Sequence, residues 1–182
     1  KGLSGATIAI KISDESNLVA NENTIIGNTV LYGATPGTLS AAGQAGDRLA
    51  VRTSVATPVI EGCDSNGCEY MTGGTVVILG NVGDNFAAGM TGGMAFIYDK
   101  FNEFEKKVNP DSVIWQNVET EYWINFLKKM VLDHSVETGS LISKNIIKNF
   151  KDEIKNFVQV CPKEMINKLE NQITLKSKIK EV

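Results

Sequence analysis

Three thiols and one imidazole are the side chains of this chain that could most readily take part in a reaction. Cys63 and Cys68 flank an Asn-Gly pair, and two neighbouring thiols can bind a metal or exchange a disulfide. No second pair follows, and Cys161 lies far away in a different type of segment. Because a zinc or iron–sulfur site needs about four ligands, we interpret Cys63 and Cys68 as residues beside a turn rather than as metal ligands.

His134 is the only histidine and would be the first candidate for acid–base catalysis. It follows a helical pattern, which places it near a helix C-terminus, where a cation or hydrogen-bond donor is favourable without any reaction. No motif pairs it with a serine, a cysteine or a carboxylate. We therefore predict no catalytic, cofactor-binding or metal-binding residue in this chain.

Two glycine-rich runs, 71–79 and 90–98, begin with the same four residues, Met-Thr-Gly-Gly. A glycine-rich turn can bind phosphate when a strand precedes it and a helix N-terminus follows. Here each glycine pair is followed by an apolar run that is typical of a strand, and no helix begins there. We therefore favour structural corners over a phosphate site. We also predict that Gly73 and Gly92 have positive φ, so that valine at either position would destabilise the fold.

Weaker copies of the two runs lie at 2–10 and 43–51. Self-similarity at about twenty residues is typical of a solenoid, in which each unit buries its apolar face only by stacking on the next unit. Each coil is expected to hold two or three short strands between corners, and a strict six-residue aliphatic period, which a hexapeptide β-helix needs, is absent. The predicted corner residues are Gly2, Gly5, Gly43, Gly46, Gly73, Gly74, Gly92 and Gly93.

The composition changes near residue 100. Sixteen of the seventeen glycines precede Lys100, and residues 1–99 hold four basic and nine acidic side chains, whereas 100–182 hold fourteen basic and twelve acidic ones. We predict a β-helix over 1–99, a connecting segment over 100–117 and an α-helical extension over 118–182 that packs on the β-helix. Within the extension, apolar spacing predicts helices over 118–132, from 141 and over 152–160, and an amphipathic segment from 163 that includes Ile179.

Charge and hydropathy exclude two classes of partner. A net charge of -3 and a pI of about 5.3 argue against a nucleic-acid surface. No uncharged apolar run is long enough to span a membrane, so we expect none. Three cysteines do not form a disulfide framework. We expect a reducing compartment, the cytoplasm or an organelle such as a plastid.

Longer motifs then point to one family. The segments 23–29, 31–35, 42–46, 61–63, 66–74 and 80–93 closely resemble the C-terminal glycine-repeat domain of the glutamate synthase large subunit. The resemblance is strong over 1–99 and looser around His134, 138–140 and 160–163. It implies a right-handed parallel β-helix, followed here by the short α-helical segment, at the end of a long multidomain enzyme.

The resemblance also implies a function for the parent enzyme. Glutamate synthases pass ammonia from glutamine to 2-oxoglutarate and reduce the product, so that two glutamates form. FMN and an iron–sulfur cluster carry the electrons from NAD(P)H or ferredoxin, with FAD in another domain or subunit. Because the family's catalytic and cofactor motifs lie in earlier domains, the resemblance implies a structural role here, holding the glutaminase and synthase domains in place.

The chain begins directly on a corner, so we expect a piece of a longer polypeptide, which as an isolated fragment could self-associate through its cut coil. The alternative is a stand-alone assembly or binding subunit of a redox complex, similar to a formylmethanofuran dehydrogenase subunit. The helical extension favours the first hypothesis. An enzyme that uses the β-helix groove ranks last, because the repeat region has only Arg48 and Arg52 as arginines and no histidine.

Overall fold

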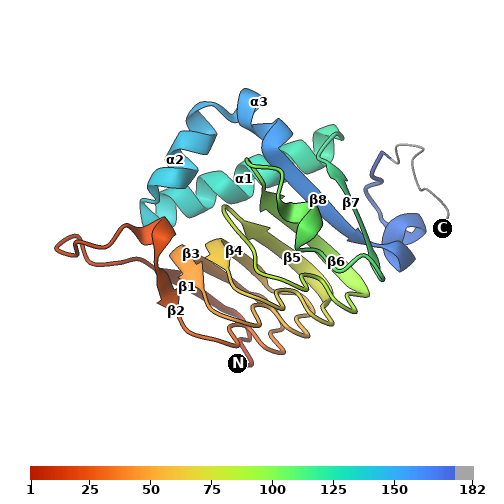
Figure 1. The fold of residues 1–182 in the computed structure, drawn as a ribbon, viewed down its shortest axis with the longest axis horizontal. Coiled ribbons are helices and arrows are strands. Elements are labelled where there is room, and N and C mark those ends of the chain that lie inside the picture. Colours follow the sequence, from red (N-terminus) through yellow and green to blue (C-terminus); the bar gives the residue numbers. More distant parts are fainter. Residues whose placement is uncertain (175–182) are drawn as a thin grey trace.

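One eight-stranded sheet runs through the protein in the computed structural model, which describes residues 1–174 (Figure 1). Five strands lie parallel, one from each coil, and two antiparallel strands complete the far edge. The parallel strands are β1 (Ala6–Ile10), β3 (Gly37–Ala45), β4 (Thr57–Cys63), β5 (Thr72–Ile78) and β6 (Gly92–Tyr98); β8 (Phe157–Pro162) and β7 (Val113–Asn117) follow, and β2 (Thr24–Ile26) pairs with β3.

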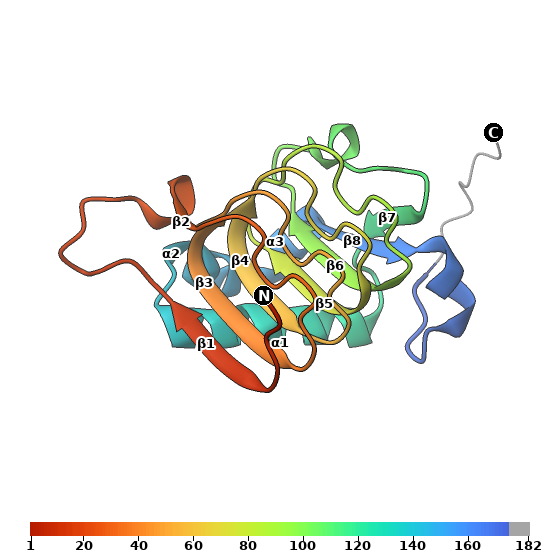
Figure 2. The same cartoon turned by 90° about the horizontal axis from the view of Figure 1, so that it is seen from below.

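The predicted solenoid is confirmed: the protein is mainly β, with stacked coils and a few helices toward the C-terminal end. The coils lie side by side in sequence order (Figure 2). The internal architecture of a coil differs from the prediction of two or three short strands. In the coils of β3, β4 and β5, a single strand is followed by an irregular return path of stacked turns.

These return paths, which we call arcs, cover residues 29–33, 48–52, 66–70 and 85–89. In every arc the first, third and fifth residues have φ between 51° and 65°, and ten of these twelve residues are not glycine. The left-handed region costs a residue with a Cβ roughly 1–2 kcal/mol. Hydrogen bonds between arcs oppose this cost, as in the bonds from the amides of Ala50, Cys68 and Ala87 to carbonyls of the preceding arc, each 2.8 Å long.

The two faces of the sheet are both buried. In β5, Val76 and Ile78 point into the coil interior, where they pack with Phe86 and other arc residues. Val77 and the following Leu79 point the other way and pack under the helices. Three layers result: arcs, sheet and helices. A sheet covered on both faces explains why its strands are almost continuously apolar.

The helices form the third layer over the outer face of the sheet (Figure 1). Trp123 and Leu127 are the buried anchors of the longest helix, and Trp123 packs against Phe96 with ring centroids 5.8 Å apart. The α-helices are α1 (Glu121–Thr138), α2 (Leu141–Lys148) and α3 (Phe150–Glu153), and short 3-10 helices cover Ala20–Glu22, Phe104–Lys106, Ile154–Asn156 and Lys163–Lys168.

The predicted helix over 152–160 is wrong. Only its beginning is helical, and Phe157–Pro162 forms β8, which pairs antiparallel with β6 and β7. Val158 and Val160 pack toward the coil interior, whereas Phe157 and Cys161 pack under the helices. This period of two satisfies both buried faces, which a helix could not do. The predicted Ile179 lies outside the described residues.

In the described part of the chain, no helix is both long and apolar enough to cross a membrane.

An asparagine ladder ties successive coils together at the arcs. The Asn85 amide donates to Asn66 Oδ1 at 2.9 Å, and Asn109 donates to Asn85 Oδ1 at 2.9 Å. Phe86 also bonds through its amide to the Lys107 carbonyl at 3.0 Å. The stacking therefore continues beyond residue 99, into the segment that we predicted to be a connector.

We expect Asn85→Gly to destabilise the protein by about 1 kcal/mol, because it removes both ladder bonds and keeps the positive φ. Asn85→Ala should cost about 1 kcal/mol more, since alanine is strained at that φ. Urea unfolding of the two variants measures the difference. Equal stability of Asn85→Gly and Asn85→Ala would contradict the strained geometry of the arc.

Candidate functional site: the buried Glu61 cluster

The predicted corner glycines lie in two structural settings. Gly2 and Gly5 precede β1 and have φ of 64° and 75°. The others lie in or beside the strands: Gly43 is inside β3, Gly46 follows it, Gly73 and Gly74 lie in β5, and Gly92 and Gly93 begin β6.

The positive φ that we predicted for Gly73 and Gly92 is wrong, because it belongs to the next residues, Gly74 and Gly93, with φ of 84° and 83°. Gly73 and Gly92 are instead positions of close backbone approach. A Cβ on Gly73 would lie 2.1 Å from the Ser54 carbonyl oxygen. A Cβ on Gly92 would lie 2.0 Å from the Thr72 carbonyl oxygen. The space in which a phosphate would approach these glycines is therefore taken by the neighbouring coil.

The three cysteines are buried and free. Burial raises the pKa of the Cys63 thiol to about 12 and that of Cys161 to about 11, and it raises the pKa of Cys68 well above its ordinary value. Within residues 1–174 no three histidine, cysteine or carboxylate side chains are grouped so that they could hold a metal ion. Cys63 and Cys68 contribute to the apolar core of the coils.

We expect the native thiols to react with iodoacetamide on the order of a thousandfold more slowly than the same thiols in concentrated urea. A raised pKa keeps each thiol protonated at neutral pH, and burial excludes the reagent. Mass spectrometry of the alkylated chain at successive times measures the rates. Rapid alkylation of Cys63 in the native protein would show that it is accessible and reactive.

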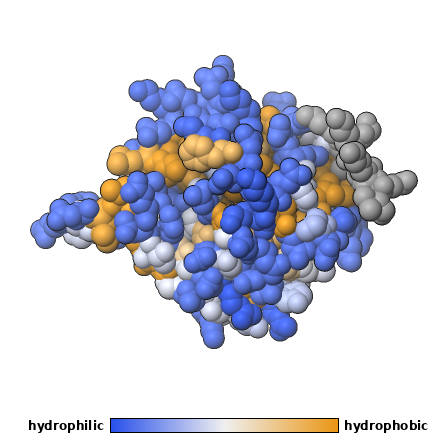
Figure 3. Space-filling view, in the orientation of Figure 1, coloured by the Kyte–Doolittle hydropathy of each residue, from blue (hydrophilic) through white to orange (hydrophobic). Residues whose placement is uncertain are grey.

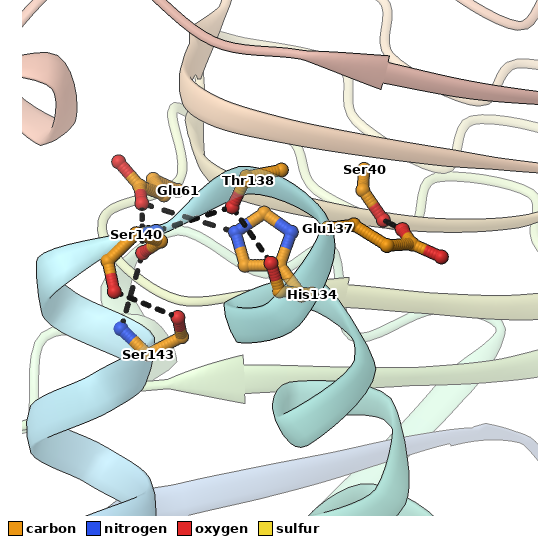
Figure 4. Close-up of polar contacts among 7 residues, drawn as sticks. All are labelled: Ser40, Glu61, His134, Glu137, Thr138, Ser140 and Ser143. Carbon is orange, nitrogen blue, oxygen red and sulfur yellow. Dashed lines mark hydrogen bonds and ion pairs between the residues drawn. The ribbon is translucent and has the colours of Figure 1, made fainter. Parts of the chain in front are cut away.

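His134 is fully buried in α1 and lies beside a carboxylate that no sequence motif pairs with it (Figure 4). Its Nε2 is 3.8 Å from Oε1 of Glu61, which is 2% exposed and comes from β4. The two residues are far apart in sequence. The one signal in the sequence was Glu61 itself, a carboxylate inside the apolar run Val59–Cys63, where a charge needs a partner.

Glu61 also accepts a hydrogen bond from the Ser140 hydroxyl, although 79 positions separate the two residues. Ser140 is the N-cap of α2, and its Oγ accepts a bond from the Ser143 amide at 3.1 Å. The Thr138 hydroxyl donates to the His134 carbonyl at 2.7 Å and accepts from the Ser140 amide at 3.3 Å. We call these five residues the Glu61 cluster, which joins the α1–α2 junction to the middle of the sheet (Figure 4).

The cluster has the residue types of a catalytic triad without its geometry. A nucleophilic serine must donate to the base that removes its proton, whereas Ser140 donates to the carboxylate. Glu61, His134, Thr138, Ser140 and Ser143 are each at most 5% exposed, so almost none of their surface is open to a substrate. The chemistry that this arrangement supports is attachment: a buried carboxylate accepts a hydrogen bond from the N-cap of α2 and lies beside the imidazole of α1.

Comparison with known proteins gives the family. The GXGXG motif model matches residues 1–163, which covers the coils, α1, α2 and β8. The chain belongs to the GXGXG family. The resemblance that the sequence motifs suggested is thereby confirmed.

Relatives of this GXGXG chain are large glutamate synthase polypeptides. The glutamate synthase [NADPH] large chain of Azospirillum brasilense is 55% identical over 175 residues, which is 96% of this chain and 12% of the relative. The corresponding chain of Bacillus subtilis is 42% identical over 94% of this chain. Ferredoxin-dependent glutamate synthase 2 of Synechocystis is 43% identical over 89% of this chain. The chain spans about a tenth of the length of these relatives.

Proposed function

We propose that this GXGXG chain is a structural domain of a glutamate synthase, which converts glutamine, 2-oxoglutarate and reductant to two glutamates. In this proposal the domain positions the glutaminase and synthase domains and is not catalytic by itself. The assignment to a glutamate synthase is supported by the relatives, which are glutamate synthases and match nearly the whole of this chain. As a division of the chain we propose the β-helix over 1–99, the connector over 100–117 and the extension over 118–182.

The structural role is supported mainly by what the buried polar residues do, which is to attach the helices to the sheet. Glu61, the buried carboxylate of β4, holds the α1–α2 junction against the sheet, and both faces of the sheet are packed. Such a three-layer body keeps a fixed shape, which a domain that orients other domains needs.

A groove on the surface supports docking of other domains. It lies between the loop 11–20 and the start of α2, has a volume of about 360 Å³, and is lined by Leu18, Val19, Leu141 and other residues. Leu18 is 53% exposed and Leu141 76% exposed. Figure 3 shows apolar side chains gathered on this side of the molecule. Contiguous exposed apolar groups of this kind are typical of interaction surfaces.

The parent's FMN and iron–sulfur cluster do not fit the residues present here. An iron–sulfur cluster needs about four thiolates, and burial holds the three thiols of this chain in the protonated form. The Gly73 and Gly92 corners leave no cradle for the phosphate of FMN, because carbonyls of the preceding coils fill the space. We therefore propose that both groups, and any FAD and NAD(P)H, bind elsewhere in the synthase.

We expect Glu61→Ala in the full-length holoenzyme to uncouple the two half-reactions, because a loosened helical layer no longer fixes the domains that contact it. Glutamine hydrolysis should persist while the ratio of free ammonia to glutamate formed rises. Asp84→Asn, which alters only the exposed contact with Lys107, is the control. An unchanged ratio in folded Glu61→Ala enzyme, or turnover by the 182-residue chain alone, would overturn the structural role.

A further inference from the structure

A narrow pocket lies between the C-terminal half of α1 and the outer face of β3 and β4, and we call it the α1 pocket. Its volume is about 220 Å³. Pockets for drug-sized ligands have volumes of roughly 300–1,000 Å³. The α1 pocket is smaller and suits one long side chain or a small molecule. Val59, Phe126 and Met130 provide apolar walls. These walls match the methylene stem of a long side chain rather than a fully polar solute.

The polar lining of the α1 pocket is rich in hydrogen-bond acceptors. Glu137 contributes a carboxylate that already accepts a hydrogen bond from the Ser40 hydroxyl, and Thr38 and Thr57 add hydroxyls. His134 lies at the inner end, between Glu61 on one side and the Ser40–Glu137 pair on the other (Figure 4). Its ring is fully buried, and neither nitrogen has a hydrogen-bond partner within the described residues.

The charges around the pocket favour a cation. Lys129 and Asp133 neutralise each other in a close ion pair on α1. The Glu137 carboxylate, one helical turn further on, has no cationic partner among residues 1–174. The lining therefore carries one uncompensated negative charge. A primary ammonium has three donors and no acceptor, which matches the Glu137 carboxylate and the threonine hydroxyls that line the pocket.

We propose that the α1 pocket binds the ammonium group of a lysine side chain supplied by the synthase polypeptide outside these 182 residues. The proposal rests on the proposed function, because it takes this chain to be one domain of a longer protein. The relatives are about ten times as long as this chain, so most of the polypeptide lies outside it. Glu137 then anchors the docked domain.

Zero-length cross-linking of the full-length holoenzyme tests the proposal. A water-soluble carbodiimide activates the Glu137 carboxylate, and a lysine amine in contact with it displaces the activated group. The product is an amide, and the reagent takes up the oxygen and leaves as its urea. Peptide mapping by mass spectrometry identifies the linked lysine. We expect Glu137 to be linked to one lysine outside residues 1–182, and Glu137→Gln to abolish this peptide. Glu121→Gln, at the exposed start of the same helix, should leave it unchanged.

The outcomes separate the two proposals. An amide from Glu137 to a lysine elsewhere in the same polypeptide supports both. An amide to a lysine of a different polypeptide supports the pocket and contradicts the placement of this chain in a single synthase chain. A second arm adds butylamine in competition. If Glu137 in the folded holoenzyme takes up only butylamine, or is linked only to lysines of residues 1–182, the pocket does not bind a docked lysine and the inference is overturned.

Discussion

We expect Gly92→Ala to destabilise the protein by about 3 kcal/mol, at the upper end of the usual cost of overpacking. The added Cβ would lie 2.0 Å from the Thr72 carbonyl oxygen and 2.6 Å from the Thr72 carbonyl carbon. Both atoms belong to the backbone of the preceding coil, which cannot turn aside as a flexible side chain would. Gly92 does not have a positive φ, so the substitution measures close approach alone. Urea unfolding followed by circular dichroism gives the free energy of unfolding.

Gly27→Ala is the matched control for Gly92→Ala. No atom lies within 4 Å of a Cβ at Gly27, and its φ is also outside the left-handed region. Alanine there should leave the free energy of unfolding within about 0.5 kcal/mol of that of the unsubstituted protein or raise it slightly. If Gly92→Ala and Gly27→Ala unfolded at the same urea concentration, the close approach of Gly92 to the Thr72 carbonyl would be contradicted.

The second large effect is expected from Glu61→Ala, which should destabilise the protein by about 3 kcal/mol, as the removal of one member of a buried polar pair does. The Ser140 hydroxyl loses its acceptor, and the buried His134 ring loses the neighbouring carboxylate. Because these contacts hold the α1–α2 junction, the loss should be local at first. Hydrogen exchange should show α2 opening at lower free energy than β5, which lies in the middle of the sheet.

Glu61→Gln keeps an oxygen that can accept from Ser140 and should cost clearly less than Glu61→Ala. Asp84→Asn weakens only an exposed ion pair with Lys107, so its effect should be barely measurable. If Glu61→Ala were as stable as Asp84→Asn, or if α2 and β5 exchanged alike, Glu61 would not attach the helical layer to the sheet.

The repeated glycine runs were sufficient to predict stacked coils, because a repeat every twenty residues leaves few other folds. They did not reveal why each glycine is needed. Gly73 and Gly74 are adjacent and look equivalent in the sequence, yet both face carbonyls of the preceding coil and only Gly74 has positive φ. Which glycine has which role depends on how the coils are stacked, and that contact is made by residues about twenty positions away.

The conformation of the arcs could not be predicted from the local sequence either. Leu31, Ala50 and Cys68 carry no local signal for positive φ, since such residues avoid that region in isolation. Each adopts it because its amide or its neighbours bond to the adjacent coil and its side chain fills the core. The helix predicted over 152–160 failed for a related reason, because β6 offered an unpaired edge that a short apolar segment could satisfy only as a strand.

The sequence by itself determined the class of fold, the family and the change of composition near residue 100, because these follow from periodicity and from motifs that are local in the chain. Only the tertiary structure decided the Glu61 cluster and the α1 pocket. Glu61, His134 and Ser140 lie in separate elements, and nothing local marks them as partners. They meet because α1 crosses the outer face of β3 and β4, where a buried carboxylate requires a donor and a helix junction supplies one.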